Sequence, residues 1–334
     1  MNLTKAIKQK AIELGFDLVG ITGAEPIDAE QINYLRNWLA AGRSAGMSYM
    51  HRNFAKRTDP ARQLPGAKSV ICVGLNYKPS PPKESSDGVS AAYATVANYA
   101  LYEDYHPFIK KRLRSLAGFM SDSAGANNYR FKICVDSAPL AERALAQRSG
   151  LGFIGANHML INPHLGLQIF LGEIITDIKL DHDSPMTNHC PDCNKCMRAC
   201  PTGALDSAGT FDANKCISYL TIEHKGQISD ELAGRFGNRL FGCDECVLAC
   251  PYDLNAPVCA NKEFKSFAQY RRIQPAQVPA WRQAQFDRFF ADSTVKRLGL
   301  ERLKRNAEIC LAKARTGQGA RKISSSSQGT SRPE

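Results

Sequence analysis

The sequence has no hydrophobic run long enough to span a bilayer. Its longest apolar stretches, such as residues 70–75, are only as long as a strand, whereas a transmembrane helix needs about 20 apolar residues. The amino-terminal segment MNLTKAIKQK has neither the apolar core of a secretory signal nor a twin-arginine motif. These absences predict a cytoplasmic protein with no membrane partner.

Acidic residues are too few to balance the basic ones. The 334 residues include 43 Lys and Arg against 32 Asp and Glu, a formal net charge of +11. A nucleic-acid partner would explain such an excess, and solvated helix faces are the alternative for any single cluster. The basic clusters are Lys110, Lys111, Arg112 and Arg114; Arg271 and Arg272; and Lys296, Arg297, Arg302, Lys304 and Arg305.

A dinucleotide-binding fingerprint is also missing. Gly150, Gly152 and Gly155 lie in the segment GLGFIG, which is expected to form a turn, and they do not follow a strand in the order that a Rossmann site requires. The sequence therefore gives no support to a nicotinamide or flavin site of that type.

Cysteine, in contrast, is abundant. Twelve cysteines in a chain expected to be cytoplasmic indicate metal binding rather than disulfides. Two runs stand out: Cys190-x-x-Cys193-x-x-Cys196-x-x-x-Cys200-Pro201 and Cys243-x-x-Cys246-x-x-x-Cys250-Pro251. The first run has the bacterial-ferredoxin spacing for 4Fe–4S clusters, in which the fourth cysteine binds the other cluster. The second run is one cysteine short, and Cys216 can supply the missing thiolate.

Ferredoxin logic divides these eight cysteines into two crossed sets of ligands. One cluster is expected on Cys190, Cys193, Cys196 and Cys250, and the other on Cys200, Cys216, Cys243 and Cys246. Zinc is the alternative, but it needs only four ligands and has no use for the C-x-x-x-C-P ending. The remaining cysteines are expected to be ordinary thiols: Cys72, Cys134, Cys259 and Cys310.

Hydrophobic periodicity predicts an α+β protein, because strands and helices alternate through the amino-terminal half. Helices are expected at 3–14, 29–41, 105–120 and 139–148, strands at 16–22, 69–76, 129–135 and 167–175, and a loop at 79–88. Four regions follow: an α/β domain at 1–185, a ferredoxin-type domain at 186–262, a helical carboxy-terminal region at 263–315 and a disordered polar tail at 316–334.

Asp136 is the carboxylate of greatest interest. It lies at the end of the strand predicted at 129–135, where α/β domains commonly place their sites. The alternative is that it caps the next helix, which is expected to begin at Pro139. His106, in the segment EDYH, could bind a ligand, although a satisfied structural histidine is the simpler interpretation.

A series of segments resembles one known family. RTDPARQLPGAKSVICVGLNY, EDYH, VDSAPLAERALAQRSGLGFIGANHMLI, CPDCNKCMRACPTGAL, CISYLTIEHKG and GNRLFGCDECVLACPYD occur in this order. Together they resemble the epoxyqueuosine reductases, cobalamin-dependent iron–sulfur enzymes. The resemblance implies an amino-terminal α/β cobalamin-binding domain and reduction of an epoxide on the modified wobble base of a tRNA anticodon. It implies that Asp136 is the proton donor and also contacts cobalamin, with further contacts from Arg57, Asn157, Ser218 and Thr221. Burial beside an apolar corrin would raise the pKa of Asp136.

The resemblance also sets expectations about partners. The tRNA base should be splayed into a pocket, an external low-potential donor should feed the clusters, and the chain should act as a monomer. The cobalamin motif D-x-H-x-x-G is absent because Ile109 replaces its glycine, which agrees with a family that binds cobalamin without a histidine on cobalt. Leu167 stands where a small polar residue is expected. The carboxy terminus is short, so the basic clusters would have to hold the tRNA.

Two other functions fit parts of the sequence. One is a related cobalamin-dependent reductive dehalogenase, although such enzymes are usually exported and have no reason to be basic. The other is a non-catalytic electron-transfer protein that holds only the two clusters.

Overall fold

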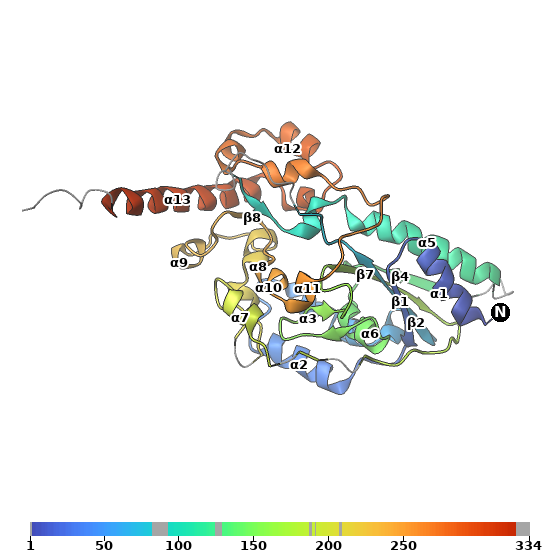
Figure 1. Cartoon of the computed structure of the whole chain (residues 1–334). Helices are drawn as coiled ribbons and strands as arrows, with labels where there is room; N and C mark the ends of the chain where they lie inside the picture. Colours follow the sequence, from blue (N-terminus) through green and yellow to red (C-terminus); the bar gives the residue numbers. More distant parts are fainter. Residues whose placement is uncertain are drawn as a thin grey trace, which may run out of the picture.

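The computed structural model describes residues 2–81, 93–123, 129–186, 189–190, 192–206 and 209–324, with side chains as far as residue 312. Its centre is a sheet in the order β1 (Leu18–Gly23), β2 (Ser69–Asn76), β7 (Ile169–Thr176) and β4 (Phe131–Cys134). All neighbouring strands are antiparallel. The protein is therefore a mixed α+β structure in which β4 forms one edge of the sheet (Figure 1).

Both faces of this sheet are buried, which explains why β2 reads as a continuous apolar run. Ile71 and Val73 point to one face, and Val70 and Cys72 point to the other, as the period of two in a strand requires. Helices α1 (Leu3–Glu13) and α5 (Tyr105–Ser123) pack on the first face, and α6 (Glu142–Arg148) packs on the second (Figure 1).

The predicted helices and strands of this half are present, with two differences. The helix expected from Pro139 begins only at Glu142, and its N-cap residue is Ala141. Pro139 fits a first helical turn sterically, but a loop occupies residues 135–141 instead. The segment GLGFIG, expected as a turn, includes β5 (Phe153–Ile154), which pairs with β6 (Leu160–Ile161). Helix α2 (Ala29–Ala40) lies where expected, and the loop predicted at 79–88 lies largely outside the described residues.

Short elements surround the cysteines. A parallel pair joins β3 (Thr95–Val96) to β8 (Arg239–Phe241), so the two halves of the chain share a small sheet. The other short elements are α3 (Ser48–Arg52), α4 (Phe54–Thr58), η1 (Pro60–Arg62), η3 (Asn98–Leu101), α7 (Lys195–Ala199), η4 (Ala213–Lys215), α8 (Ile217–Ile222), α9 (Asp230–Ala233), α10 (Glu245–Leu248) and α11 (Pro251–Leu254).

The carboxy-terminal region is mostly helical, as predicted. It consists of η5 (Ala268–Arg272), η6 (Pro275–Ala280), α12 (Gln283–Phe289), η7 (Thr294–Leu298) and α13 (Leu300–Ser324). Its side chains Trp281, Phe290 and Leu303 belong to the same buried cluster as Ile7 of α1 and Ile109 of α5. The region therefore packs directly on the amino-terminal half.

Composition predicts a disordered tail from residue 316, whereas α13 continues through Ser324. The physical reason is that an existing helix is extended more easily than a new one is begun, and the nearest helix-stopping proline is Pro333. Residues 325–334 of the predicted tail lie outside the described residues. Among the described residues, no helix combines the length and apolar character needed to cross a bilayer.

Candidate active site

Asp136 occupies a strained turn directly after β4. Its backbone φ is +53°, a left-handed conformation that is uncommon outside glycine but that Asp and Asn tolerate best. Such strain persists only where the surrounding structure enforces it, and it is concentrated at functional sites. Asp136 does not cap α6, because Ala141 is the N-cap residue of that helix. The helix-cap alternative is therefore wrong.

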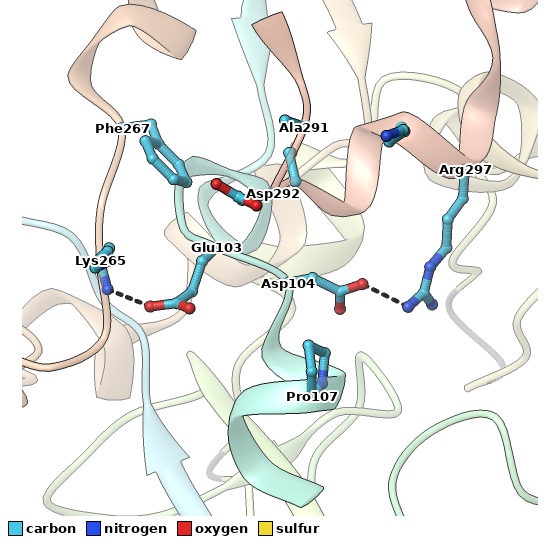
Figure 2. A pocket seen from close by; sticks show the side chains of 10 residues that line it. Glu103, Asp104, Pro107, Lys265, Phe267, Ala291, Asp292 and Arg297 are labelled. Atoms are coloured by element: carbon cyan, nitrogen blue, oxygen red, sulfur yellow. Dashed lines mark hydrogen bonds and ion pairs between the residues drawn. The ribbon is translucent and has the colours of Figure 1, made fainter. Parts of the chain in front are cut away.

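The side chain of Asp136 is one end of a polar chain. His106 Nε2 lies 3.1 Å from Asp136 Oδ2, and His106 Nδ1 lies 2.7 Å from Asp104 Oδ1. Arg297 from η7 donates to the other oxygen of Asp104 over 2.5 Å, as Figure 2 shows. The side chain of His106 is only 6% exposed, whereas that of Asp136 is 59% exposed. The catalytic candidate thus faces open space, and its histidine partner is buried behind it.

The charged groups next to Asp136 lower the pKa of its carboxyl group, whereas burial alone would raise it. Desolvation would raise the pKa, but the hydrogen bond and charge of His106, the Tyr105 hydroxyl and the charge of Arg297 together lower it below its ordinary value. Desolvation would likewise lower the pKa of His106, but Asp104 and Asp136 raise it. In the protein alone, these shifts favour a carboxylate on Asp136 beside a protonated imidazole on His106. The expectation that burial beside a corrin raises the pKa of Asp136 concerns the cobalamin-bound protein and stays a prediction.

Two glutamates lie next to this turn and were not anticipated from the sequence. The backbone N–H of Asp136 donates to Glu142 Oε1 over 2.5 Å. Glu173, in the middle of β7, is fully buried, and neither of its oxygens receives a hydrogen bond from a donor among the described residues. Burial and the charge of Asp136 raise the pKa of Glu142 to about 7, and burial and Glu142 raise the pKa of Glu173 well above its usual value. Two carboxylates cannot hydrogen-bond to each other, so this pair is stable only while it holds a proton.

The residues predicted to contact cobalamin do not all reach Asp136. Arg57 lies beside the loop that carries Asp136, because its backbone carbonyl accepts from the N–H of Ala141 over 3.0 Å. Its Nε atom is buried and has no hydrogen-bond partner among the described residues. Ser218 is half-buried in α8. The hydroxyl of Thr221 is fully buried; it donates to backbone carbonyls of α8 and accepts from the N–H of Gly242. Thr221 therefore offers no exposed side-chain surface to a ligand.

Asn157 lies with the first group of cysteines instead. Its side chain donates to the Cys246 carbonyl over 3.1 Å. It also lines a small cavity together with all four cysteines of the first predicted set: Cys190, Cys193, Cys196 and Cys250. The fold thus brings a cysteine of the second run to three cysteines of the first, which is the crossed arrangement that ferredoxin logic predicts.

The second group of cysteines is also close together. Burial raises the pKa of the Cys246 thiol, and the charges of Cys216, Cys243 and Cys200 raise it further. Cys216 and Cys243 also pack against the same buried hydrophobic cluster, so Cys216 lies near the second run despite its distance in sequence. Among the described side chains, no three His, Cys, Asp or Glu residues converge on the position of a single metal ion. A cubane does not need such convergence, because each of its irons takes a separate thiolate.

Several arginines of the predicted nucleic-acid surface have structural roles. Arg112 is buried, lies over the ring of Phe108 and pairs with Glu263. Arg302 donates to the carbonyls of Leu298, Ile222 and Arg297, and Arg305 donates to those of Leu220, His224 and Gly226. These guanidinium groups attach α13 to the cysteine-bearing half and are not free for phosphate. Lys111 and Arg114 on α5 are exposed.

An antiparallel α+β domain with a strained acid, joined to eight cysteines in two groups, defines an iron–sulfur oxidoreductase. Two family comparisons agree with this class. Residues 189–253 match the family "4Fe-4S double cluster binding domain", and residues 57–137 match "Epoxyqueuosine reductase QueG, DUF1730". The chain is 40% identical over 309 residues to the epoxyqueuosine reductase of Xanthomonas campestris pv. campestris, covering 92% of this chain and 86% of the relative. It is 36% identical to that of Vibrio cholerae, covering 93% and 84%. The chain belongs to the epoxyqueuosine reductase family.

Solved structures give the same result. An epoxyqueuosine reductase crystallised with an epoxyqueuosine-modified tRNA-Tyr stem loop superposes with a TM-score of 0.85 at 30% identity, covering 93% of this chain and 81% of that one. An epoxyqueuosine reductase from Bacillus subtilis superposes with a TM-score of 0.86 at 27% identity, covering 99% and 87%. In that structure, a catalytic loop named for its aspartate is swung out of the active site.

Proposed function

We propose that this protein reduces epoxyqueuosine to queuosine in the anticodon of tRNA. The observation that carries the proposal is the strained turn of Asp136, which presents an exposed carboxylate in a chain that also carries two cysteine groups for clusters. A protein that only transferred electrons would have no use for this turn. The relative solved with a modified tRNA stem loop supports the choice of substrate.

The balance of the reaction explains why both halves are needed. Opening the epoxide, removing its oxygen as water and leaving an alkene takes two electrons and two protons. Iron–sulfur clusters transfer electrons singly, so two clusters can deliver the pair in sequence. We assign Cys190, Cys193, Cys196 and Cys250 to one cluster, and Cys200, Cys216, Cys243 and Cys246 to the other. An external low-potential donor supplies the electrons.

The residues around Asp136 fit cobalamin, whose amide side chains and phosphate require polar partners. The buried Nε of Arg57 has no partner among the described residues and is suited to hold such a group, and Ser218 is a second candidate. Bound cobalamin would supply a cobalt centre able to attack or reduce a ring carbon. Asp136 protonates the departing oxygen, and its exposed position leaves room for the base. Asn157 and Thr221 support the surrounding structure rather than this pocket.

We further propose that the protein acts as a cytoplasmic monomer and that a base splayed from the anticodon loop enters the site. The loop that swings out in the Bacillus subtilis relative corresponds in this proposal to the turn of Asp136. The test is metal analysis of anaerobically purified protein together with conversion of epoxyqueuosine-containing tRNA. About eight irons and one cobalt per chain, with formation of queuosine, are expected. Iron without any corrinoid, and no conversion, would refute the proposal.

A further inference from the structure

The polar chain of Asp136 does not end at His106. Asp104, on the other side of the imidazole, also lines a cavity of about 460 Å³ (Figure 2). Its other lining residues include Glu103, Lys265, Asp292 and Lys296, so the walls are strongly polar. Asp136 is not among the lining residues. Contacts of 3.1 and 2.7 Å through the imidazole and the carboxylate of Asp104 therefore connect the catalytic turn to this cavity.

We propose that His106 stores and relays the proton that Asp136 delivers, and that Asp104 and the adjoining cavity return protons to His106 from solvent. This inference rests on the proposed function, because it concerns the same leaving oxygen. It gives His106 the role of a relay residue rather than that of a satisfied structural histidine.

The proton movements balance with the reaction. In the first step, His106 gives its Nε2 proton to Oδ2 of the Asp136 carboxylate, and the leaving oxygen takes a proton from that carboxyl group. The imidazole then changes from its Nδ1–H to its Nε2–H tautomer, and Asp104, whose carboxylate exchanges protons with water in the cavity, returns a proton to the vacated Nδ1. A second transfer along the same route supplies the second proton, so that the oxygen departs as water. Two protons leave the protein and two enter it in each turnover.

The surroundings of His106 favour storage of a proton. The carboxylates of Asp104 and Asp136 face its two ring nitrogens, and the ring of Tyr105 stacks on it at 4.1 Å. One opposing charge is close: Arg297 Nη1 lies 3.2 Å from Nε2, but the same guanidinium is paired with Asp104. The two acids outweigh burial and raise the pKa of His106 above its ordinary value. Activity that depends on the protonated imidazole is therefore present below this raised pKa and is lost as pH rises through it.

The first test measures the pKa of His106 directly and does not depend on enzyme activity. The seven histidines are labelled with nitrogen-15 in the cluster-loaded, oxidised protein and are titrated by NMR. We expect the pKa of His106 to lie above 6.5 and to fall in both Asp136→Asn and Asp104→Asn, since each removes a facing carboxylate. A His106 signal that titrates identically in the parent and in Asp136→Asn would overturn the relay.

The second test is the single-turnover rate as a function of pH. His106→Gln can still donate a hydrogen bond to Asp136 but cannot store a proton, so a purely structural histidine would be rescued by it. We expect the single-turnover rate of His106→Gln to be at least about a hundredfold lower than that of the parent. We also expect that the rate of this variant no longer falls at the high pH at which the parent loses activity. His182→Gln changes an exposed histidine that follows β7 and should keep the parent profile.

The outcomes separate the two proposals. If His106→Gln reacts at the parent rate with the parent pH profile, the relay is refuted although the proposed function stands. If the parent itself does not convert epoxyqueuosine-containing tRNA, the proposed function fails, and the NMR titration still decides whether His106 holds a proton shared with Asp136.

Discussion

The backbone N–H of Asp136 donates a hydrogen bond of 2.5 Å to Oε1 of Glu142, across the loop between β4 and α6. This contact stabilises the left-handed backbone of Asp136. A separate contact, from His106 to the carboxylate, positions its side chain. Glu142 can stabilise this backbone only if its own carboxyl group is fixed. Its neighbour Glu173 is buried, and the pKa of each of the two carboxyl groups depends on the other.

The glutamate pair should make folding stability depend on pH. The pKa of Glu142 is about 7 in the folded protein against 4.5 as its ordinary value, so the folded state holds more protons between these values. Stability should therefore be greatest at low pH within this window and should fall as pH rises toward 7. Glu173→Gln removes a second buried carboxyl group whose own pKa is raised by burial and by Glu142, and it should flatten this dependence in urea unfolding measured from pH 4.5 to 7.5. An unchanged slope would contradict the coupling.

Cys216 should be required for one cluster. Cys216→Ala is expected to lower the iron content or convert a cubane to a three-iron cluster, because the second cysteine run lacks a fourth thiolate without it. Iron analysis and electron paramagnetic resonance of the reduced protein measure this. Cys259→Ala is the matched control, since Cys259 belongs to neither ligand set and should keep full iron. A Cys216→Ala protein with the parent iron content and spectrum would remove Cys216 from the ligand set.

Asn306 should be important for stability. Its side chain is fully buried and donates to the carbonyls of Thr221 and Leu240 over 2.9 and 3.0 Å, linking α13 to α8 and β8. Asn306→Ala leaves both carbonyls unsatisfied, which should lower the free energy of unfolding by about 1–3 kcal/mol for each. Gln277→Ala, which changes an exposed residue, should stay within about 0.5 kcal/mol. Equal denaturant midpoints for the two variants would contradict this role.

Binding of tRNA should depend strongly on salt, because each phosphate contact releases counterions. Lys111→Glu and Arg114→Glu change exposed cations on α5, and each should weaken binding and reduce the salt slope by about one if it contacts phosphate. Arg302→Glu should instead destabilise the fold, because that side chain donates to three backbone carbonyls. Affinities measured between 50 and 200 mM salt decide the matter. Binding that ignores salt would exclude an electrostatic tRNA surface.

The sequence predicted regular elements well because their signals are local. The apolar run 69–76 became β2, and helix 105–120 became α5, since alternation and helical periodicity act over a few residues. Contacts between residues far apart in the sequence were predictable only for the cysteines, because the ferredoxin spacing indicates which cysteines share a cluster. The Asp104–His106–Asp136–Arg297 chain joins segments almost 200 residues apart, and no local pattern encodes it. Glu173 had a weak signal: an acid inside the apolar strand segment IFLGEIIT.

Basic clusters were the least reliable guide. The sequence predicted exposed charges at Arg112, Arg302 and Arg305. Their guanidinium groups instead donate to backbone carbonyls within the fold. An arginine with several donors serves equally well to join helices and to bind phosphate. Only the tertiary contacts distinguish the two uses.

The most direct test of the proposed mechanism is single-turnover conversion of epoxyqueuosine-containing tRNA by reduced Asp136→Asn. Asn tolerates the same left-handed backbone and keeps the shape of the side chain, but it cannot supply a proton. The variant should keep its iron and cobalt contents and its tRNA affinity, and conversion should slow by about a hundred- to ten-thousand-fold. If Asp136→Asn, with clusters and cobalamin intact, forms queuosine at the parent rate, then Asp136 is not the proton donor.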